Sequence, residues 1–445
     1  MDQTSFEGEA SGNGRFSRLQ LVVVFLCAMV VVFDGYDTQS IAYVAPQIAR
    51  EWNVSSASFG PIFSAGLVGL AAGNLFLGPL ADKLGRKLVI LASVAVFGAF
   101  ALLTSFASGM TDLLILRFIT GLGLGAAMPN AIALTSEFAP ARFRATAVMI
   151  MFCGFPLGSV LGGVLAGPLM DHYGWRSVFW IGGAVPLLML PVLWFLLPES
   201  PRFLATRSGN EQRIGRILEQ IGASQPIETF IAAVQTESAA EGKGPAVTKL
   251  FSGGLAVSTM LLWTAFFTNL LVMYFLVSWL PTLIEQAGLP LRVGIMSVAI
   301  MNLAGVVGAI ALSRLLDLWN PYWTLALCYA GAALFIVLLA SGATSGYMVL
   351  VAAALTGVGI VGGQIGCNAI AAAQYPTAIR ATGVGWALGI GRIGAIVGPL
   401  VGGSLLAAAW SPQSIIFLAS VPVGVAAMAI LTLGLLHRGA TGTAA

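Results

Sequence analysis

The feature that most constrains this chain is a series of apolar stretches, each long enough to cross a membrane. A bilayer core of about 30 Å takes roughly 20 apolar residues per helix. Six such stretches precede a polar interval and six more follow it. They lie at about 19–45, 57–81, 88–108, 112–137, 144–169 and 176–197, and then at about 254–281, 293–316, 321–341, 346–371, 379–406 and 413–436. The chain is therefore predicted to be an all-α membrane protein with twelve transmembrane helices.

The composition excludes several other classes of protein. Charged residues make up only 9% of the 445 residues, whereas a soluble domain carries about 25%. The net charge of +3 is small and scattered, so we expect no nucleic-acid partner. The four cysteines stand alone in apolar stretches, and the two histidines lie at segment ends. We therefore expect no disulfide framework, no metal site, no cofactor and no enzymatic activity.

The two sets of six stretches repeat each other. Matching residues recur at offsets of 235 or 236 positions, and the pairs are Gly73 and Gly308, Asp82 and Asp317, Gly121 and Gly357, Pro140 and Pro376, and Gly158 and Gly394. We predict two pseudo-symmetric six-helix bundles, with a central site at their interface. The expected division is an N-terminal tail (1–18), the first bundle (19–197), a linker (198–252), the second bundle (253–437) and a C-terminal tail (438–445).

The distribution of positive charge predicts the orientation in the membrane. If both termini and the linker share one side, that side carries 16 of the 21 Lys and Arg residues. Only Arg50, Arg176 and Arg292 then lie on the opposite side. By the positive-inside rule both termini are cytoplasmic, which suits a multi-pass protein of a bacterial inner membrane. The linker contains one short amphipathic helix, near Glu211–Ile221.

Two carboxylates lie inside the first span, at Asp34 and Asp37. A charged side chain at the centre of a span costs about 2.5–3.5 kcal/mol on insertion scales, so both need a reason to be there. Residues three apart share a helix face, and like charges so close favour holding a proton on one of them. Gly35 between them allows close packing or local unwinding. We predict proton binding here, against the alternative that one carboxylate only pairs with an arginine.

Three more charged residues occupy or close later spans. Arg117 in the fourth span must lie close to a carboxylate or carbonyl, unless it snorkels to the nearby surface. Glu137 closes the same span and is predicted to take part in proton coupling as a gate or network carboxylate, with structural ion pairing as the alternative. Arg392 falls about half-way through the eleventh span, so snorkelling is difficult. We predict that Arg392 binds a substrate carboxylate, with a structural partnership to a first-half acid as the alternative.

Uncharged polar and aromatic side chains supply further substrate-binding candidates. Amides can donate a hydrogen bond to a ring hydroxyl or can join helices to one another. Aromatic side chains can stack on an aromatic ring, and Trp386 lies nearly two turns before Arg392. The predicted substrate-binding set, besides Arg392, is Trp386, Tyr36, Gln39, Asn269, Gln364 and Asn368.

The loop after the second span resembles the signature loop of the major facilitator superfamily. It reads GPLADKLGRK, and the matching residues are Gly78, Asp82, Gly85, Arg86 and Lys87. The second copy keeps Asp317 but has lost the basic part. The resemblance implies a role in conformational switching. Arg117, followed by a glycine-rich run, resembles the fourth-helix motif of the superfamily, which implies that it couples proton binding to the conformational change.

The Asp-Gly-x-Asp element at Asp34 and Asp37 resembles the aromatic acid:H+ symporter family within that superfamily. The resemblance covers the whole chain and includes LPESPRFL from Leu197 to Leu204. It implies uptake of a benzoate-type acid such as 4-hydroxybenzoate or protocatechuate, with protons and membrane lipid as the other partners.

We therefore predict a monomeric, proton-coupled symporter that imports a small aromatic carboxylate by alternating access, as part of aromatic hydrocarbon catabolism. One alternative is a porter of the same fold for another organic acid, a sugar or another metabolite. A carrier of dicarboxylates would need a second cation deep in the membrane, and Arg392 is the only well-centred one in the sequence, which favours a monocarboxylate. Another alternative is a non-transporting sensor built on a porter fold.

Overall fold

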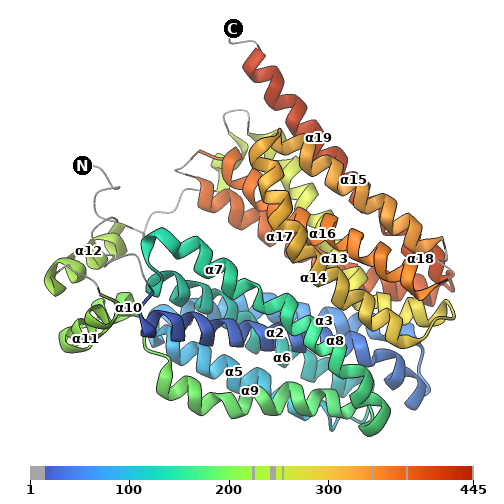
Figure 1. Cartoon of the computed structure of the whole chain (residues 1–445), viewed down its shortest axis with the longest axis horizontal. Helices are drawn as coiled ribbons and strands as arrows, with labels where there is room; N and C mark the ends of the chain where they lie inside the picture. Colours follow the sequence, from blue (N-terminus) through green and yellow to red (C-terminus); the bar gives the residue numbers. More distant parts are fainter. Residues whose placement is uncertain are drawn as a thin grey trace.

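The computed structural model describes residues 16–222, 226–240, 247–252, 255–341, 345–376 and 379–442. These residues form long helices, and no strand occurs among them. Twelve helical segments in the described ranges are long and apolar enough to cross a membrane, which confirms the predicted all-α class and the number of spans. Figure 1 shows the helices of the two halves as two bundles that lie side by side.

The first half holds six spans, of which the second and the fifth are interrupted. The second span changes from α-helix to a π-helical turn, η2, and then to a 3₁₀ turn before its last short helix. The elements are α2 (Arg18–Glu51); η1 (Ser56–Ser58), α3 (Phe59–Ala72), η2 (Gly73–Leu77), η3 (Gly78–Leu80) and α4 (Ala81–Leu84); α5 (Arg86–Thr104); α6 (Met110–Phe138); η4 (Ala141–Phe143), α7 (Arg144–Phe152) and α8 (Gly154–Tyr173); and α9 (Arg176–Leu196).

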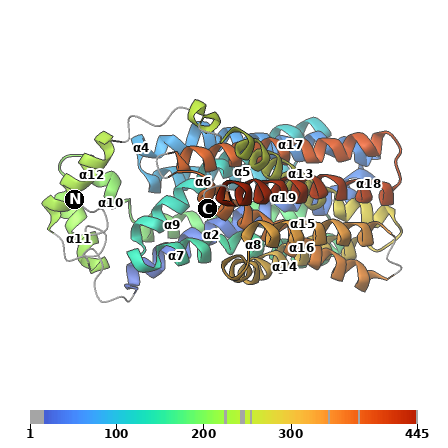
Figure 2. The ribbon, with the colours of Figure 1, turned by 90° about the horizontal axis from the view of Figure 1, so that it is seen from above.

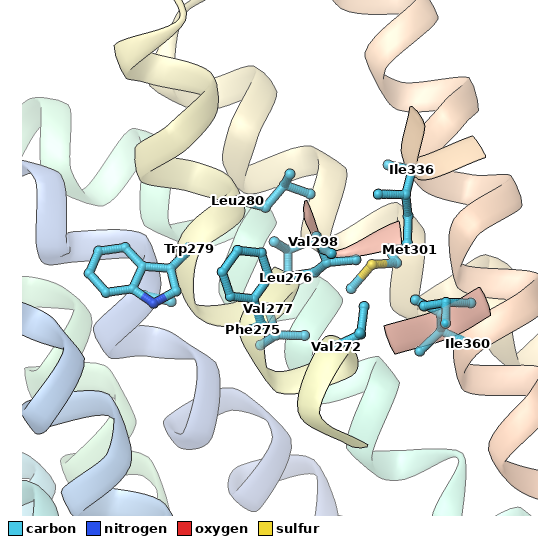
Figure 3. Packing of buried hydrophobic residues seen from close by; sticks show 14 of the residues in the cluster. Val272, Phe275, Leu276, Val277, Trp279, Leu280, Val298, Met301, Ile336 and Ile360 are labelled. Carbon is cyan, nitrogen blue, oxygen red and sulfur yellow. The ribbon is translucent and has the colours of Figure 1, made fainter. Parts of the chain in front are cut away.

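The second half holds the other six spans. Their elements are α13 (Ala256–Gln286), α14 (Leu291–Leu318), α15 (Pro321–Ala340), α16 (Gly346–Gln374), α17 (Arg380–Ala407), and α18 (Pro412–Leu418) with α19 (Ser420–Gly442). Figure 3 shows how side chains from several of these helices interlock, with Leu276 of α13 near Val298 and Met301 of α14, and Ile360 of α16 beyond them.

The linker between the halves folds into short helices with a small apolar core of their own. The elements are α10 (Pro201–Ala205), α11 (Glu211–Ile221), α12 (Ile227–Ala240) and η5 (Val247–Phe251). Figure 2 shows α10, α11 and α12 gathered at one end of the molecule, beyond the ends of the spans. Helix α11 coincides with the predicted amphipathic helix, and its Ile214 and Leu218 are buried against Leu204 and Val234.

Glycines of the internal repeat do the same packing work in both halves. A Cβ atom on Gly121 would lie 2.0 Å from the carbonyl oxygen of Gly66, and one on Gly357 would lie 2.0 Å from that of Met301. Such contacts require glycine because they bring two helix backbones together. The repeat seen in the sequence therefore reflects two bundles that pack by the same rule.

Gly35 packs α2 tightly against α8. A Cβ atom at this position would lie 2.0 Å from the carbonyl oxygen of Phe155, and α2 continues through the glycine without a break. Of the two roles that the sequence left open for Gly35, close packing is confirmed and local unwinding is wrong. The contact also fixes the rotation of α2, and with it the direction in which Asp34 and Asp37 point.

The two halves are joined at the end of the spans away from the linker. Arg50 forms an ion pair with Glu285 at 2.7 Å, and the Ser64 hydroxyl donates to the carbonyl oxygen of Ile396 at 2.8 Å. The ring of Trp279 meets that of Phe63 edge to face. Figure 3 shows Trp279 extending from α13 toward the first half, and Figure 1 shows the two halves diverging toward the linker end.

Candidate functional site

Arg117 and Asp37 form a buried ion pair inside the first half. The Nη1 atom of Arg117 lies 3.2 and 3.1 Å from the two carboxylate oxygens of Asp37, and each side chain is only 3% exposed. Nη2 donates to the hydroxyls of Thr104 at 2.8 Å and Thr120 at 3.0 Å. The Arg117 guanidinium also lies over the ring of Phe179. Arg117 does not snorkel to the surface, so that alternative is wrong.

The two threonines that support this pair were missed by the sequence argument. Thr120 is three residues after Arg117 on the same helix, so its helical spacing was a usable signal. Thr104 ends a different helix, α5, and nothing in the sequence connects it to Arg117.

Asp34 has a different environment, although it shares a helix with Asp37. It is 2% exposed, and its Oδ1 atom accepts a hydrogen bond from the Thr38 hydroxyl at 3.0 Å. Within the described residues no arginine or lysine lies within ion-pair distance of Asp34. The charges that act on it from further away are the positive one of Arg392 and the negative one of Asp37. Asp34 is thus a buried carboxylate without a directly bonded cation.

Arg392 lies on α17 in the second half, and its charge is felt by Asp34 across the interface between the halves. Its side chain is half-buried. Among the residues that the structure describes, Arg392 has no hydrogen-bond or ion-pair partner. A guanidinium carries five N–H donors in a planar fork that matches a carboxylate. In this structure Arg392 is therefore not bonded to an acid of the first half, which was the alternative to substrate binding.

A small cavity lies between the two halves beside the Asp37–Arg117 pair. From the first half it is lined by Asp37, Thr38 and Arg117, and from the second half by Tyr274 and Ser278 of α13. Asp34 and Arg392 are not in its lining, but Thr38 joins the two regions because its hydroxyl binds Asp34. In this cavity, side chains from both halves face a common space.

The predicted amides of the second half form a connected network. The Nδ2 atom of Asn269 donates to Gln364 Oε1 at 2.7 Å, and Gln364 Nε2 donates to Asn368 Oδ1 at 3.4 Å. Asn269 is fully buried, and its Oδ1 atom has no hydrogen-bond partner in the described part of the chain. The network therefore joins helices and keeps one unused acceptor.

The other residues predicted to bind the substrate contact neighbouring groups of the protein. The Tyr36 hydroxyl donates to the carbonyl oxygen of Val178, and Gln39 accepts from Tyr43. Trp386 stacks on Trp263 with ring centres 5.9 Å apart. None of these three predicted residues lines the cavity, so their role in substrate binding stays a prediction.

The predicted switch loop is anchored by residues from two other parts of the first half. Arg86 pairs with Glu137 of α6, and Glu137 also accepts from the Ser200 hydroxyl. Glu199 Oε1 accepts from three backbone N–H groups, those of Arg86 at 2.8 Å, Lys87 at 3.2 Å and its own neighbour Ser200 at 2.8 Å. A carboxylate at a helix N-terminus stabilises that helix, here α5.

This arrangement makes Glu137 a network carboxylate, one of the roles predicted for it. Glu199 and Ser200 were not among the predicted site residues, although the LPESPRFL segment that contains them was noted. Gly85 has φ +96°, and a Cβ atom there would lie 2.3 Å from the Glu199 carboxylate, so both its backbone and its surroundings require glycine.

The family model that describes the Major Facilitator Superfamily matches residues 25–343 and 299–444. The chain belongs to this superfamily. Three similar curated proteins are the gallate transporter of Pseudomonas putida (41% identical, 95% of this chain and 93% of that protein), the 4-hydroxybenzoate transporter PcaK of Pseudomonas aeruginosa (39%, 96% and 95%) and the 3-(3-hydroxy-phenyl)propionate transporter of Escherichia coli (38%, 94% and 94%). The resemblance to aromatic acid transporters is thereby confirmed.

Solved structures agree on the major facilitator fold. The chain is similar to the xylose transporter XylE from E. coli in its inward open conformation, with a TM-score of 0.76 and 17% identity over 92% of this chain and 95% of that one. It is also similar to a bacterial homologue of the human lysosomal transporter Spinster, with a TM-score of 0.69 and 18% identity over 94% and 97%. The protein is thus a multi-pass membrane protein of a transporter superfamily.

The other residues of the superfamily's signature loop have simpler surroundings. Gly78 lies in η3, and Asp82 is exposed in the first turn of α4, with no hydrogen bond or ion pair to the rest of the described chain. Asp317 lies in the last turns of α14, and its side chain is outside the described set. Their role in conformational switching stays a prediction.

Proposed function

We propose that the protein is a proton-coupled symporter that imports a small aromatic carboxylate of the 4-hydroxybenzoate or gallate type. It would do so across the inner membrane of a bacterium, with both termini and the linker in the cytoplasm. The relatives that support the substrate class are named transporters of gallate, 4-hydroxybenzoate and 3-(3-hydroxy-phenyl)propionate.

The observation that carries the proposal is the environment of Arg392. A buried or half-buried charge inside a membrane protein is normally paired, because leaving it unpaired is costly. Arg392 has no bonded partner in the described ranges, yet it lies near the interface between the halves where a substrate must pass. A substrate carboxylate would satisfy it by two parallel N–H···O hydrogen bonds.

Asp34 is the better of the two carboxylates for carrying the proton. Asp37 is already neutralised by Arg117 at hydrogen-bond distance, whereas Asp34 has only the Thr38 hydroxyl and the more distant charge of Arg392. A substrate carboxylate bound to Arg392 would use that positive charge, and Asp34 would then take up a proton more readily. Substrate binding and proton binding would each favour the other, as linkage requires.

The arrangement of the halves fits alternating access. Contacts between them, such as Arg50 with Glu285, lie at the end away from the linker. With a cytoplasmic linker, this is the arrangement of an inward-facing transporter. The Arg86–Glu137 pair and Glu199 hold the switch loop to the first half, so that this half can move as a unit. One chain contains both halves, so a monomer would provide the whole transport pathway.

The experiment that tests the proposal is uptake of radiolabelled 4-hydroxybenzoate and gallate by cells expressing the protein, with and without a protonophore. We expect accumulation that collapses when the proton gradient is dissipated. Cells carrying the empty vector give the background. Accumulation that survives the protonophore would refute proton coupling. Absence of uptake by well-expressed protein would refute these two substrates and favour another organic acid or a sugar.

A further inference from the structure

A second pocket lies at the linker end of the molecule, away from the transport site. It is bounded by the ends of α2, α5 and α9 and by the linker helix α11. Its charged lining residues are Lys87, Arg213, Arg216 and Glu199, so three cations face a single carboxylate. Neither the transport site nor the signature loop accounts for the two arginines.

These cations are available to a ligand. Arg213 and Arg216 are three apart on α11 and exposed, and neither has a hydrogen bond or ion pair in the described part of the chain. Lys87 uses one of its three donors on the carbonyl oxygen of Trp194, at 2.6 Å. Its ammonium group is attracted by the Glu199 carboxylate and repelled by Arg213, and Glu199 also accepts from three backbone N–H groups. The pocket therefore keeps an excess of positive charge.

An apolar wall adjoins the cations. Trp194, Phe195 and Leu196 end α9 and line the pocket, and their side chains are 56%, 81% and 54% exposed. Leu88, at the start of α5, is a further exposed apolar side chain of the lining. Because α5 and α9 are membrane spans, these side chains lie where the hydrocarbon meets the head groups, a position that suits tryptophan. A ligand that fills the pocket thus needs an anionic head and an apolar body.

We propose that this pocket binds the head group of an anionic phospholipid, such as phosphatidylglycerol or cardiolipin. Basic pockets between transmembrane helices at the membrane surface bind such head groups. The phosphate would lie between Lys87, Arg213 and Arg216, and an acyl chain would lie along Trp194 and Phe195. Because the cations come from α5 and from α11, the lipid holds the linker against the first half.

The test is native mass spectrometry of the purified full-length protein titrated with phosphatidylglycerol, with phosphatidylcholine and with inorganic phosphate as separate probes. The variant carries Arg213→Gln and Arg216→Gln. Its matched control carries Arg142→Gln and Lys249→Gln, which remove two exposed cations outside the pocket. At about 1 kcal/mol per arginine and 1.4 kcal/mol per tenfold, the variant should bind phosphatidylglycerol about 30-fold more weakly.

The control should bind phosphatidylglycerol as the wild type does. Phosphatidylcholine should bind weakly to the wild type, the variant and the control alike. Equal phosphatidylglycerol affinity in variant and control would overturn the proposal. So would displacement of the lipid by millimolar inorganic phosphate, because that result describes a free-anion site. If the double variant does not fold, Arg216→Gln alone should still lower the affinity about fivefold.

Discussion

Two arginines inside the membrane, Arg117 and Arg392, have opposite surroundings. Arg117 is 3% exposed and is bonded to Asp37 and to two threonine hydroxyls, all within the first half. Arg392 is half-buried, belongs to the second half and has no bonded partner in the part of the chain that the structure describes. Removing one partner of a bonded buried pair destabilises a fold, whereas an unpaired guanidinium keeps its N–H donors for a ligand. On our proposal, the comparison separates an arginine that is held within the fold, Arg117, from one that binds the substrate, Arg392.

The largest effect is expected for Arg117→Ala, which leaves the Asp37 carboxylate buried and unpaired. Breaking a buried ion pair in this way costs about 3–5 kcal/mol. We expect a much lower yield of folded protein and a lower midpoint of thermal unfolding in detergent. The double variant Asp37→Asn with Arg117→Gln should recover part of the loss. A single variant as stable as the wild type would show that Arg117 is not the structural arginine.

Arg392→Ala should have the opposite signature, a loss of substrate binding with unfolding unchanged. Removing one partner of a desolvated charge pair costs about 2–5 kcal/mol, which is roughly 30- to 4,000-fold in affinity. Uptake of 4-hydroxybenzoate should fall to background, while membrane expression stays normal. Arg292→Ala, at an exposed position, is the control. Full uptake by Arg392→Ala would end its assignment to the substrate carboxylate.

Asp34→Asn sharpens the comparison because Asp34 feels Arg392 while Asp37 is bonded to Arg117. An asparagine cannot release or take up the coupled proton, so the variant should equilibrate substrate but not concentrate it. For one proton per substrate, the wild type gains up to about tenfold accumulation, or about 1.4 kcal/mol, per unit of pH gradient, acidic outside. Proteoliposomes with an imposed gradient measure this. Gradient-driven accumulation by Asp34→Asn would transfer the proton role elsewhere.

The smallest effect is expected at a third arginine, Arg50, whose exposed pair with Glu285 joins the halves. The Arg50 side chain is 63% exposed, and exposed ion pairs contribute about 0–1 kcal/mol. Arg50→Gln should therefore change the rate of uptake less than about fivefold. High salt should abolish the difference from the wild type, because it screens exposed charges. A complete loss of uptake would mean that the Arg50–Glu285 contact contributes far more to the transport cycle than an exposed ion pair does.

Sequence reasoning gave the number of spans because the thickness of the bilayer acts on each helix separately. Every predicted apolar stretch corresponds to a helix that can span the membrane, and the start and end of α11 were also predicted correctly. The repeated glycines pointed to two similar halves for a related reason. A glycine needed for contact between backbones is needed again wherever the same contact recurs, as at Gly121 and Gly357.

The candidate residues could be chosen from the sequence, but their partners could not. Asp34, Asp37, Arg117 and Arg392 stand out because a charge in a span is costly. Which carboxylate Arg117 meets depends on the rotation of α2, which its contact with α8 at Gly35 determines. Thr104 joins the pair only because α5 ends beside α6. Pairing depends on packing between helices far apart in the chain, so only the tertiary structure decided it.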